Sequence, residues 1–231
     1  AACWGNNADG QLGNNSTTNS PTPVPVSGIT SGATAISAGK AHTCAIVNGA
    51  AWCWGDNSSG QLGNNSTTDS PVPVPVSGLS SGVTSIAAGN SHSCAVVGGA
   101  AKCWGGGGNG QLGVGTPTVS NVPLQVTGLT SNVTGIFAGW RFNFAIVGGA
   151  VKAWGQNSNA QLGLGYSSSV ELSPVDVPGL ATGTASVSAG RYHGCALMQG
   201  GSLQCWGANS SGQLGDGSFT PHPSRRPAGR S

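Results

Sequence analysis

The stretch CWGDNSSGQLG at residues 53–63 decides the fold of this chain, because four close copies of it occur in the same sequence. The copies are CWGNNADGQLG at 3–13, CWGGGGNGQLG at 103–113, AWGQNSNAQLG at 153–163 and CWGANSSGQLG at 205–215. Their tryptophans lie at positions 4, 54, 104, 154 and 206, so successive copies are 50, 50, 50 and 52 residues apart. A regular period of this length is typical of repeat proteins, in which each unit buries its apolar surface against its neighbours.

Composition favours an all-β fold with many turns. Charged residues are 6% of the 231 residues, against about 25% in a typical soluble domain, and 41 residues are Gly. Short β-branched runs are interrupted by Gly, Pro, Asn and Ser. No apolar run of about 18 residues occurs, so we expect no membrane insertion. The chain starts without Met or an apolar leader, and we expect any signal peptide to have been removed or to lie upstream.

The net charge of +2 does not indicate nucleic-acid binding. Three of the eight basic residues, Arg225, Arg226 and Arg230, lie within the last seven positions. The remaining chain has five basic and six acidic residues, without the clustered basic face that phosphates require. We therefore expect no nucleic-acid partner, and we interpret residues 224–231 as a tail or linker.

One repeat, residues 83–132, shows the order of the expected strands. Apolar and small residues alternate in the first strand, and Gly98-Gly99 predicts a tight turn between the second and third. The last strand contains Pro123, which is typical of an edge strand. Four antiparallel strands, repeated radially, form a propeller blade. The predicted strands are residues 83–88, 92–97, 100–104 and 122–127.

We predict an all-β fold, a β-propeller of four-stranded antiparallel blades that is incomplete in this chain, with about four blades. Missing sequence or oligomerisation would complete the ring. The predicted units are a partial blade at 1–32 with third and fourth strands, blades at 33–82, 83–132 and 133–184, a near-complete blade at 185–223, and the tail or linker at 224–231.

The repeat resembles that of the regulator of chromosome condensation. The resemblance rests on the pattern Ala-Gly-x-x-His-(Ser/Thr)-Cys-Ala, followed by Cys-Trp-Gly-x-Asn-x-x-Gly-Gln-Leu-Gly, and it runs from Ala1 to about Pro221. It implies a β-propeller, usually of seven blades, but it does not fix an activity. The paired cysteines suggest an exported bacterial type. The activity for which the family is named, guanine-nucleotide exchange on a small GTPase, is intracellular.

Six of the seven cysteines face one another across predicted hairpins. Counting back from the Asn48-Gly49 turn places Cys44 opposite Cys53, in a pair whose Cα atoms lie about 4.5 Å apart. In the fourth repeat Phe144 faces Ala153, so both cysteines are lost together. We therefore predict three disulfides, which are Cys44–Cys53, Cys94–Cys103 and Cys195–Cys205. The alternative is that these thiols are buried and reduced.

Disulfides combined with few charges favour a secreted protein, extracellular or periplasmic. Cys3 has no predicted partner, and we expect it to be unpaired or to form an intermolecular disulfide. A homo-oligomer in which two chains share one ring is one possible consequence.

Three histidines occupy one repeat position, but they do not indicate a metal site. Successive blades hold His42, His92 and His193 far apart, and the fourth copy has Phe142 instead. We interpret them as structural imidazoles that bond the backbone. The single glutamate, Glu171, provides no carboxylate pair for acid–base catalysis, and the cysteines lack zinc-site spacing. We predict no enzyme activity, no cofactor and no metal.

Recognition is expected where the repeats differ, because the recurring Trp and Leu residues build the blade. The two positions after Ala-Gly differ in every copy, and in a propeller they lie on loops around one mouth of the ring. Two aromatic residues and two arginines match the composition of interface hot spots, although these could also be ordinary exposed loop residues. The predicted binding residues are Lys40, Asn90, Trp140, Arg141, Arg191 and Tyr192.

Together, these patterns predict a non-enzymatic, exported β-propeller scaffold that binds a protein or cell-surface ligand through one face of the ring. One alternative is an intracellular guanine-nucleotide exchange factor for a small GTPase, which requires reduced cysteines. A second is a structural repeat protein that assembles into a fibre or coat. The identical stretches at 10–18 and 60–68 suit this last role.

Overall fold

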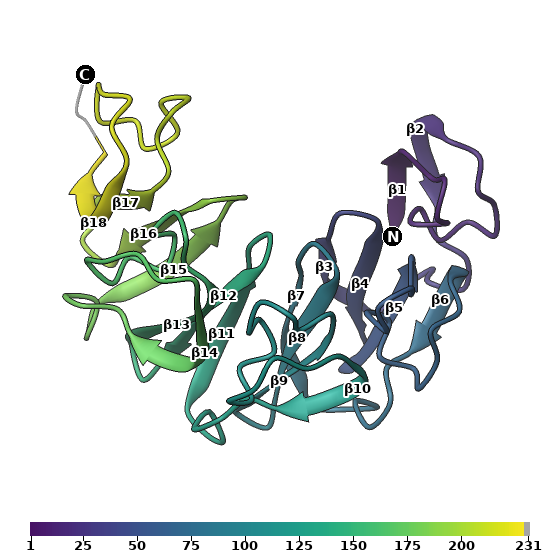
Figure 1. Cartoon of the computed structure of the whole chain (residues 1–231). Coiled ribbons are helices and arrows are strands. Elements are labelled where there is room, and N and C mark those ends of the chain that lie inside the picture. The colour runs from purple at the N-terminus through teal and green to yellow at the C-terminus, as the bar shows by residue number, and fades with distance from the viewer. Residues whose placement is uncertain (229–231) are drawn as a thin grey trace.

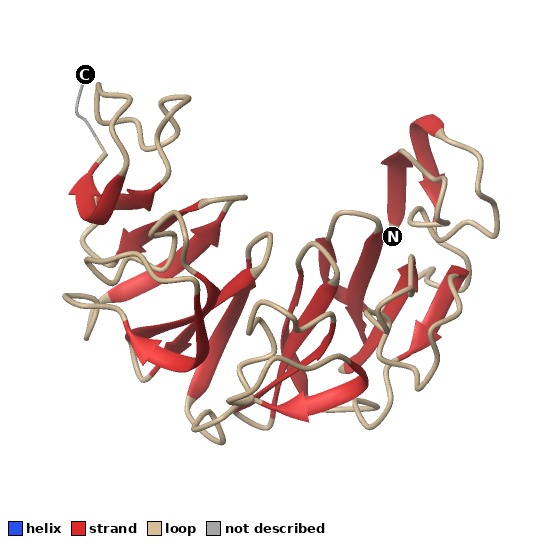
Figure 2. Cartoon of the chain, viewed as in Figure 1, coloured by secondary structure: helices blue, strands red, loops and turns tan. Residues whose placement is uncertain are grey.

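The computed structural model describes residues 1–228, and every regular element in this part of the chain is a β-strand (Figure 1, Figure 2). The strands form one two-stranded and four four-stranded antiparallel sheets. The first sheet contains β1 (Ala2–Gly5) and β2 (Ser20–Pro25). The others are β3 (Ala33–Ala38), β4 (His42–Val47), β5 (Ala50–Gly55) and β6 (Ser70–Pro75); β7 (Val83–Ala88), β8 (His92–Val97), β9 (Ala100–Gly105) and β10 (Ser120–Gln125); β11 (Val133–Ala138), β12 (Phe142–Val147), β13 (Ala150–Gln156) and β14 (Val170–Asp176); and β15 (Thr184–Ala189), β16 (His193–Met198), β17 (Leu203–Gly207) and β18 (His222–Pro227).

The sheets follow one another around an open arc, with β1 and β18 near its two ends (Figure 1). Strands within each sheet pair in sequence order, and the first strands β3, β7, β11 and β15 contact one another in turn. Each four-stranded sheet is thus one propeller blade. The predicted all-β class and blade architecture are confirmed.

Several predicted boundaries differ from those of the structure. The outer strand β10 covers Ser120–Gln125 rather than 122–127, because the chain turns inward at Val126, which is fully buried and donates its N–H to Ala101 O at 3.0 Å. The last blade is complete rather than near-complete, because β18 pairs with β17 and contains residues assigned to the tail.

The β18 residues are an unusual strand sequence, HPSRRP. An edge strand needs backbone hydrogen bonds on one side only and tolerates proline, so it can form without an apolar pattern. Arg226 lies opposite Cys205, and Arg225 donates a hydrogen bond to Gln204 Oε1. The rest of the expected tail, residues 229–231 with Arg230, lies outside the described residues. The unit expected to begin at 185 starts with β15 at Thr184.

The three predicted disulfides are present, and each joins the second and third strands of one blade. Asn48 and Gly49 have φ values of 52° and 77°, the left-handed pair that a two-residue hairpin turn requires. This turn sets Cys44 opposite Cys53 with a Cα–Cα distance of 4.1 Å. The disulfides Cys94–Cys103 and Cys195–Cys205 have the same Cα–Cα distance of 4.1 Å.

We expect replacement of both Cys94 and Cys103 by Ala to lower the free energy of unfolding by about 2–4 kcal/mol. This disulfide closes a short loop, so its loss raises the conformational entropy of the unfolded chain. Both cysteines are fully buried, so the loss also removes packing contacts from the core. Urea denaturation of the double variant measures the effect. The control is Cys3→Ala, which removes a cysteine that is free in the described chain and should leave the midpoint nearly unchanged. Equal midpoints for all three proteins would contradict a stabilising role.

Each buried tryptophan joins two neighbouring blades. Trp54, Trp104, Trp154 and Trp206 are 0% exposed. Each donates its indole N–H to the backbone oxygen of the Gln in the preceding Gly-Gln-Leu-Gly, or Ala-Gln-Leu-Gly for Trp206, at 2.8 to 3.0 Å. The leucine of every copy is also buried. Trp4 differs, with 64% of its surface exposed, because no blade precedes it in the described chain.

Candidate functional site

The predicted recognition loops meet at the concave centre of the arc. Each loop joins the first strand of a blade to the second, and one short backbone bond closes it. In the first complete blade Gly39 N–H donates to His42 O at 2.8 Å, and the other three blades repeat this bond at 2.8 to 2.9 Å. The two variable residues therefore project from a tight turn at a fixed place on each blade.

Backbone hydrogen bonds also connect one loop to the next. Lys40 N–H donates to Gly89 O at 3.1 Å, Asn90 N–H to Trp140 O at 3.1 Å, and Trp140 N–H to Gly190 O at 3.3 Å. Because main-chain bonds set these spacings, the side chains of four different blades are held at fixed separations. The site is a property of the arc and not of any single repeat.

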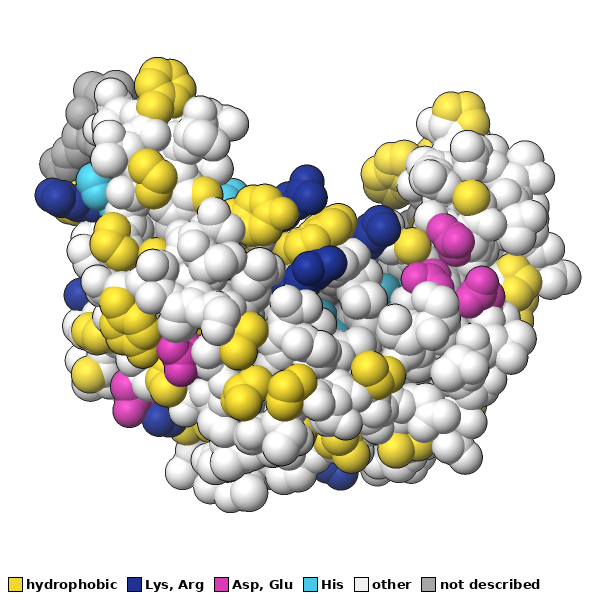
Figure 3. Space-filling view, in the orientation of Figure 1, with side chains coloured by type: hydrophobic (Ala, Val, Ile, Leu, Met, Phe, Trp, Pro, Cys, Tyr) yellow, Lys and Arg dark blue, Asp and Glu magenta, His cyan; other side chains and the backbone are white. Residues whose placement is uncertain are grey.

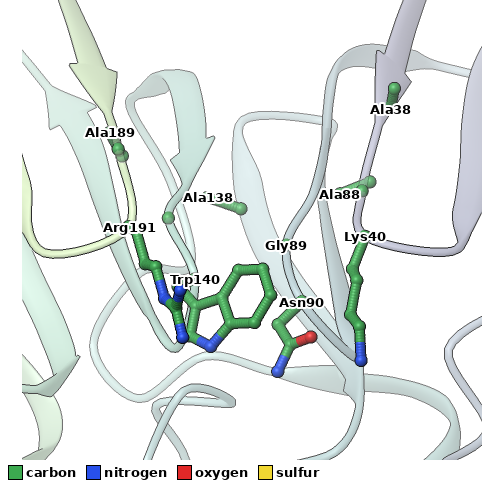
Figure 4. Close-up of a pocket in the computed structure, with 12 residues that line it drawn as sticks. Ala38, Lys40, Ala88, Gly89, Asn90, Ala138, Trp140, Ala189 and Arg191 are labelled. Carbon is green, nitrogen blue, oxygen red and sulfur yellow. The ribbon is translucent and has the colours of Figure 1, made fainter.

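Four of the six predicted binding residues line one concavity of about 260 Å³, which also contains the alanines and glycines that precede them (Figure 4). The Arg191 guanidinium lies 4.8 Å from the centroid of the Trp140 ring, and Lys40 Nζ lies 6.0 Å from it. Both distances are within the range of cation–π attraction. Asn90 lies between Lys40 and Trp140 (Figure 4).

Tyr192 joins this group through Arg191, whose guanidinium is 5.0 Å from the Tyr192 ring centroid. Arg141 is exposed and does not line the concavity. The structure therefore brings together five of the six predicted residues. We call Lys40, Asn90, Trp140, Arg191 and Tyr192 the mouth cluster.

The mouth cluster is basic and aromatic. None of the residues lining the concavity in residues 1–228 is acidic. The two ion pairs in the described chain, Lys152–Asp176 and His222–Asp216, leave Lys40 and Arg191 without a carboxylate partner. Lys and Arg atoms adjoin hydrophobic side chains in the hollow of the molecule, and the Asp and Glu side chains in this view lie outside it, some of them on the arm beside it (Figure 3). This distribution is complementary to a negatively charged ligand.

Two of the three repeated histidines, His42 and His92, are buried and bond side chains, where backbone partners were predicted. His42 Nε2 lies 2.9 Å from Ser93 Oγ, and His92 Nε2 lies 2.9 Å from Asn143 Oδ1, in each case on the following blade. Burial lowers the pKa of each histidine from 6.5 to about 4. Both imidazoles are therefore neutral at pH 7 and act as hydrogen-bonding links between blades.

The long loops after Gly-Gln-Leu-Gly are organised by buried asparagines that the sequence analysis missed. Asn57 is 0% exposed, and its Nδ2 donates to Ser66 O and Thr68 O, both at 3.0 Å. Its Oδ1 accepts the N–H of Leu62 at 2.9 Å. The available signal was the asparagine three residues after Trp in four of the five copies. The buried asparagines are Asn7, Asn57, Asn157 and Asn209.

The described residues contain no group of three or more His, Cys, Asp or Glu side chains placed to hold a metal ion. Among the elements of residues 1–228, no helix is long and apolar enough to cross a membrane.

Two protein-family models match segments of the chain that correspond to these repeats. The family model described as the regulator of chromosome condensation (RCC1) repeat matches residues 3–46, 48–96, 103–146 and 148–197. A second model of that description matches residues 33–61 and 185–213. The chain belongs to the RCC1 repeat family. The resemblance inferred from the repeat pattern is thereby confirmed.

Solved structures of RCC1-type proteins share this fold. Human WBSCR16 aligns with a TM-score of 0.86 and 24% identity, over 98% of this chain and 62% of that one. Yeast RCC1 (Prp20) bound to Kap60 aligns with a TM-score of 0.78 and 21% identity, over 93% of this chain and 52% of that one. Prp20p from Saccharomyces cerevisiae aligns with a TM-score of 0.77 and 22% identity, over 93% of this chain and 54% of that one. The RCC1 repeats here thus span less than two thirds of each of these proteins. No curated protein matches the chain significantly in sequence.

Proposed function

We propose that this RCC1 repeat chain is a non-enzymatic, exported scaffold that binds an acidic segment of a partner protein through the mouth cluster. The observation that carries the proposal is the concavity of about 260 Å³ in which Lys40 and Arg191 approach the Trp140 ring without a carboxylate in the lining. Aromatic and arginine side chains gathered in one hollow are typical of residues that dominate binding energy.

The disulfides support export. Six of the seven cysteines form three disulfides, and such bonds persist in oxidising compartments outside the cytoplasm. Their presence weighs against the alternative of an intracellular exchange factor, since a reducing environment would open them.

Solved structures with this fold support the proposal that the partner is a protein. Prp20 was crystallised with Kap60, and the binding of Prp20p to Gsp1p and histones was studied with its structure. Those partners belong to the yeast protein. What supports our proposal is that a propeller of this type can present a protein-binding surface.

Replacement of Trp140 by Ala is expected to weaken partner binding by more than about 2 kcal/mol, or about 30-fold in affinity. The indole forms one wall of the concavity and lies against the Arg191 guanidinium, so truncation removes contact area and frees the cation. Proteins captured from extracellular fluid by the oxidised chain would be identified by mass spectrometry, purified and titrated against both forms by calorimetry.

Tyr166→Ala is the matched control, because Tyr166 is a 50% exposed aromatic residue outside the mouth cluster. Equal losses of affinity for the two variants would show that the site is elsewhere.

An acidic partner also predicts binding that weakens as the salt concentration increases. Salt-independent affinity would contradict the charge of the proposed ligand, and accelerated nucleotide release from a small GTPase would favour the exchange-factor alternative. Concentration-dependent fibre growth would favour the structural alternative.

A further inference from the structure

The Arg191 guanidinium is positioned by two aromatic rings. Its central carbon lies 4.8 Å from the centroid of the Trp140 ring and 5.0 Å from that of the Tyr192 ring. A stacked guanidinium keeps its N–H groups at the edge of its plane, where they match the two oxygens of a carboxylate. Arg191 is exposed and takes part in neither of the two ion pairs of residues 1–228. It is therefore a prepared anchor for one carboxylate of a ligand.

Lys40 provides a second cation close to the same indole. In Figure 4, Arg191 and Lys40 lie on opposite sides of Trp140. Lys40 Nζ is 6.0 Å from the Trp140 centroid, so the two cations cannot be farther apart than the sum of their distances from this ring. Asn90 lies between Lys40 and Trp140, and its amide can bond a peptide main chain (Figure 4). The mouth cluster thus has two positive ends and a neutral centre.

The main chain of the loops offers few donors to an anion. The N–H groups of Lys40, Asn90 and Trp140 already donate to backbone oxygens of the neighbouring loops. The rest of the concavity is lined by alanines and glycines, which have no side-chain donor. Recognition of an anionic ligand therefore depends on side chains, and the two cations decide where its charges must lie.

An extended peptide can present two charges with this arrangement. Successive side chains of a strand point to opposite faces, and residues i and i+2 lie about 6.6 Å apart on the same face. Two acidic residues separated by one residue therefore direct both carboxylates to the mouth cluster. Two adjacent acidic residues direct only one carboxylate to it.

We propose that the mouth cluster binds an extended peptide segment with two acidic residues separated by one residue. One carboxylate pairs with Arg191 and the other with Lys40, while Asn90 bonds the main chain of the residue between them. This inference rests on the proposed function, because it names the motif that the acidic partner presents. Arg191 is the stronger anchor, since its planar donors bond both oxygens of one carboxylate, and Lys40 determines the spacing.

The probes are two blocked peptides of the same composition and charge, Gly-Gly-Glu-Ser-Glu-Gly-Gly and Gly-Gly-Ser-Glu-Glu-Gly-Gly. Each would be titrated into the oxidised full chain at low ionic strength, where exposed charges are least screened. NMR shifts of the Trp140 indole N–H measure the affinity. We expect the peptide with separated glutamates to bind about 5-fold more tightly, which corresponds to one additional exposed ion pair.

Two variants assign the carboxylates to their cations. Lys40→Ala should make the affinities of the two peptides equal, because it removes the second cation. Arg191→Ala should weaken the binding of both by more than about 10-fold, because it removes hydrogen bonds to a charged group. The matched control is Arg141→Ala, which removes the same charge from an exposed loop residue that does not line the concavity. It should leave both affinities nearly unchanged.

The outcomes separate this inference from the proposed function. If both peptides bind the unmodified chain equally and Arg191→Ala weakens both, the spacing is wrong and the proposed function stands. If Arg141→Ala weakens binding as much as Arg191→Ala, or if neither peptide binds, both proposals are overturned.

Discussion

Replacement of Trp104 by Ala is expected to lower the free energy of unfolding by about 3–5 kcal/mol, one of the two largest effects that we predict for this chain. Trp104 is 0% exposed and packs in a cluster with residues of the preceding blade, including Leu62 and Val76. Its Nε1 donates to Gln61 O at 2.9 Å. The ring lies so close to the preceding blade that a Cβ added at Gly63 would be 2.6 Å from Nε1.

Truncation of this side chain leaves a cavity between two rigid sheets, and such sheets cannot collapse easily to fill it. Urea denaturation at pH 7 measures the loss. The chain contains a matched control in Trp4, which has the same repeat position but is 64% exposed. Trp4→Ala should change the free energy of unfolding by less than about 1 kcal/mol. Similar losses for the two variants would show that burial between blades is not the cause.

Acidification from pH 6.5 towards pH 4 is expected to destabilise the chain by about 3 kcal/mol for each of His42 and His92. Burial lowers the pKa of both imidazoles from 6.5 to about 4. In this range the two imidazoles take up protons in the unfolded chain but not in the folded chain, so a lower pH reduces the free energy of unfolding. Stability is therefore complete above about pH 6.5 and declines as the pH falls to about 4.

Urea midpoints measured between pH 6.5 and 5 isolate this effect from the carboxylates. Hydrogen bonding to Ser218 keeps the pKa of Asp216 below its ordinary 3.8, so this residue titrates beneath the chosen range. The control replaces both histidines by Phe, the residue found at this position in Phe142. The double variant should lose most of the pH dependence, whatever its stability at pH 7. An unchanged dependence on pH would rule out the two histidines as its source.

The blade at residues 133–176 shows why a change in one repeat must be accommodated by another. Phe144 replaces a disulfide cysteine, and its ring packs edge-on against Phe142 and Trp206, with centroid separations of 5.5 Å. Gly194 on the next blade makes room for it, because a Cβ at this position would lie 2.8 Å from the Phe144 ring. The sequence shows both substitutions, but only the packing shows that they belong together.

The sequence by itself determined the repeat, the all-β class and the register of each central hairpin. A two-residue turn such as Asn48-Gly49 fixes which residues face each other within a few positions, so Cys44 and Cys53 could be paired by counting. It also indicated the mouth residues, because they differ in a repeat whose other positions recur. Local chain geometry is sufficient for each of these predictions.

The tertiary structure alone decided which residues meet from different blades. Lys40, Trp140 and Arg191 are separated by about 50 residues or more, and their contact depends on how far each blade turns relative to the last. The same packing gives His42 a partner in Ser93, and pairing with β17 makes the proline-containing segment at 222–227 an edge strand. Sequence periodicity repeats within each blade, but it does not encode the angle between blades, and that angle places these groups.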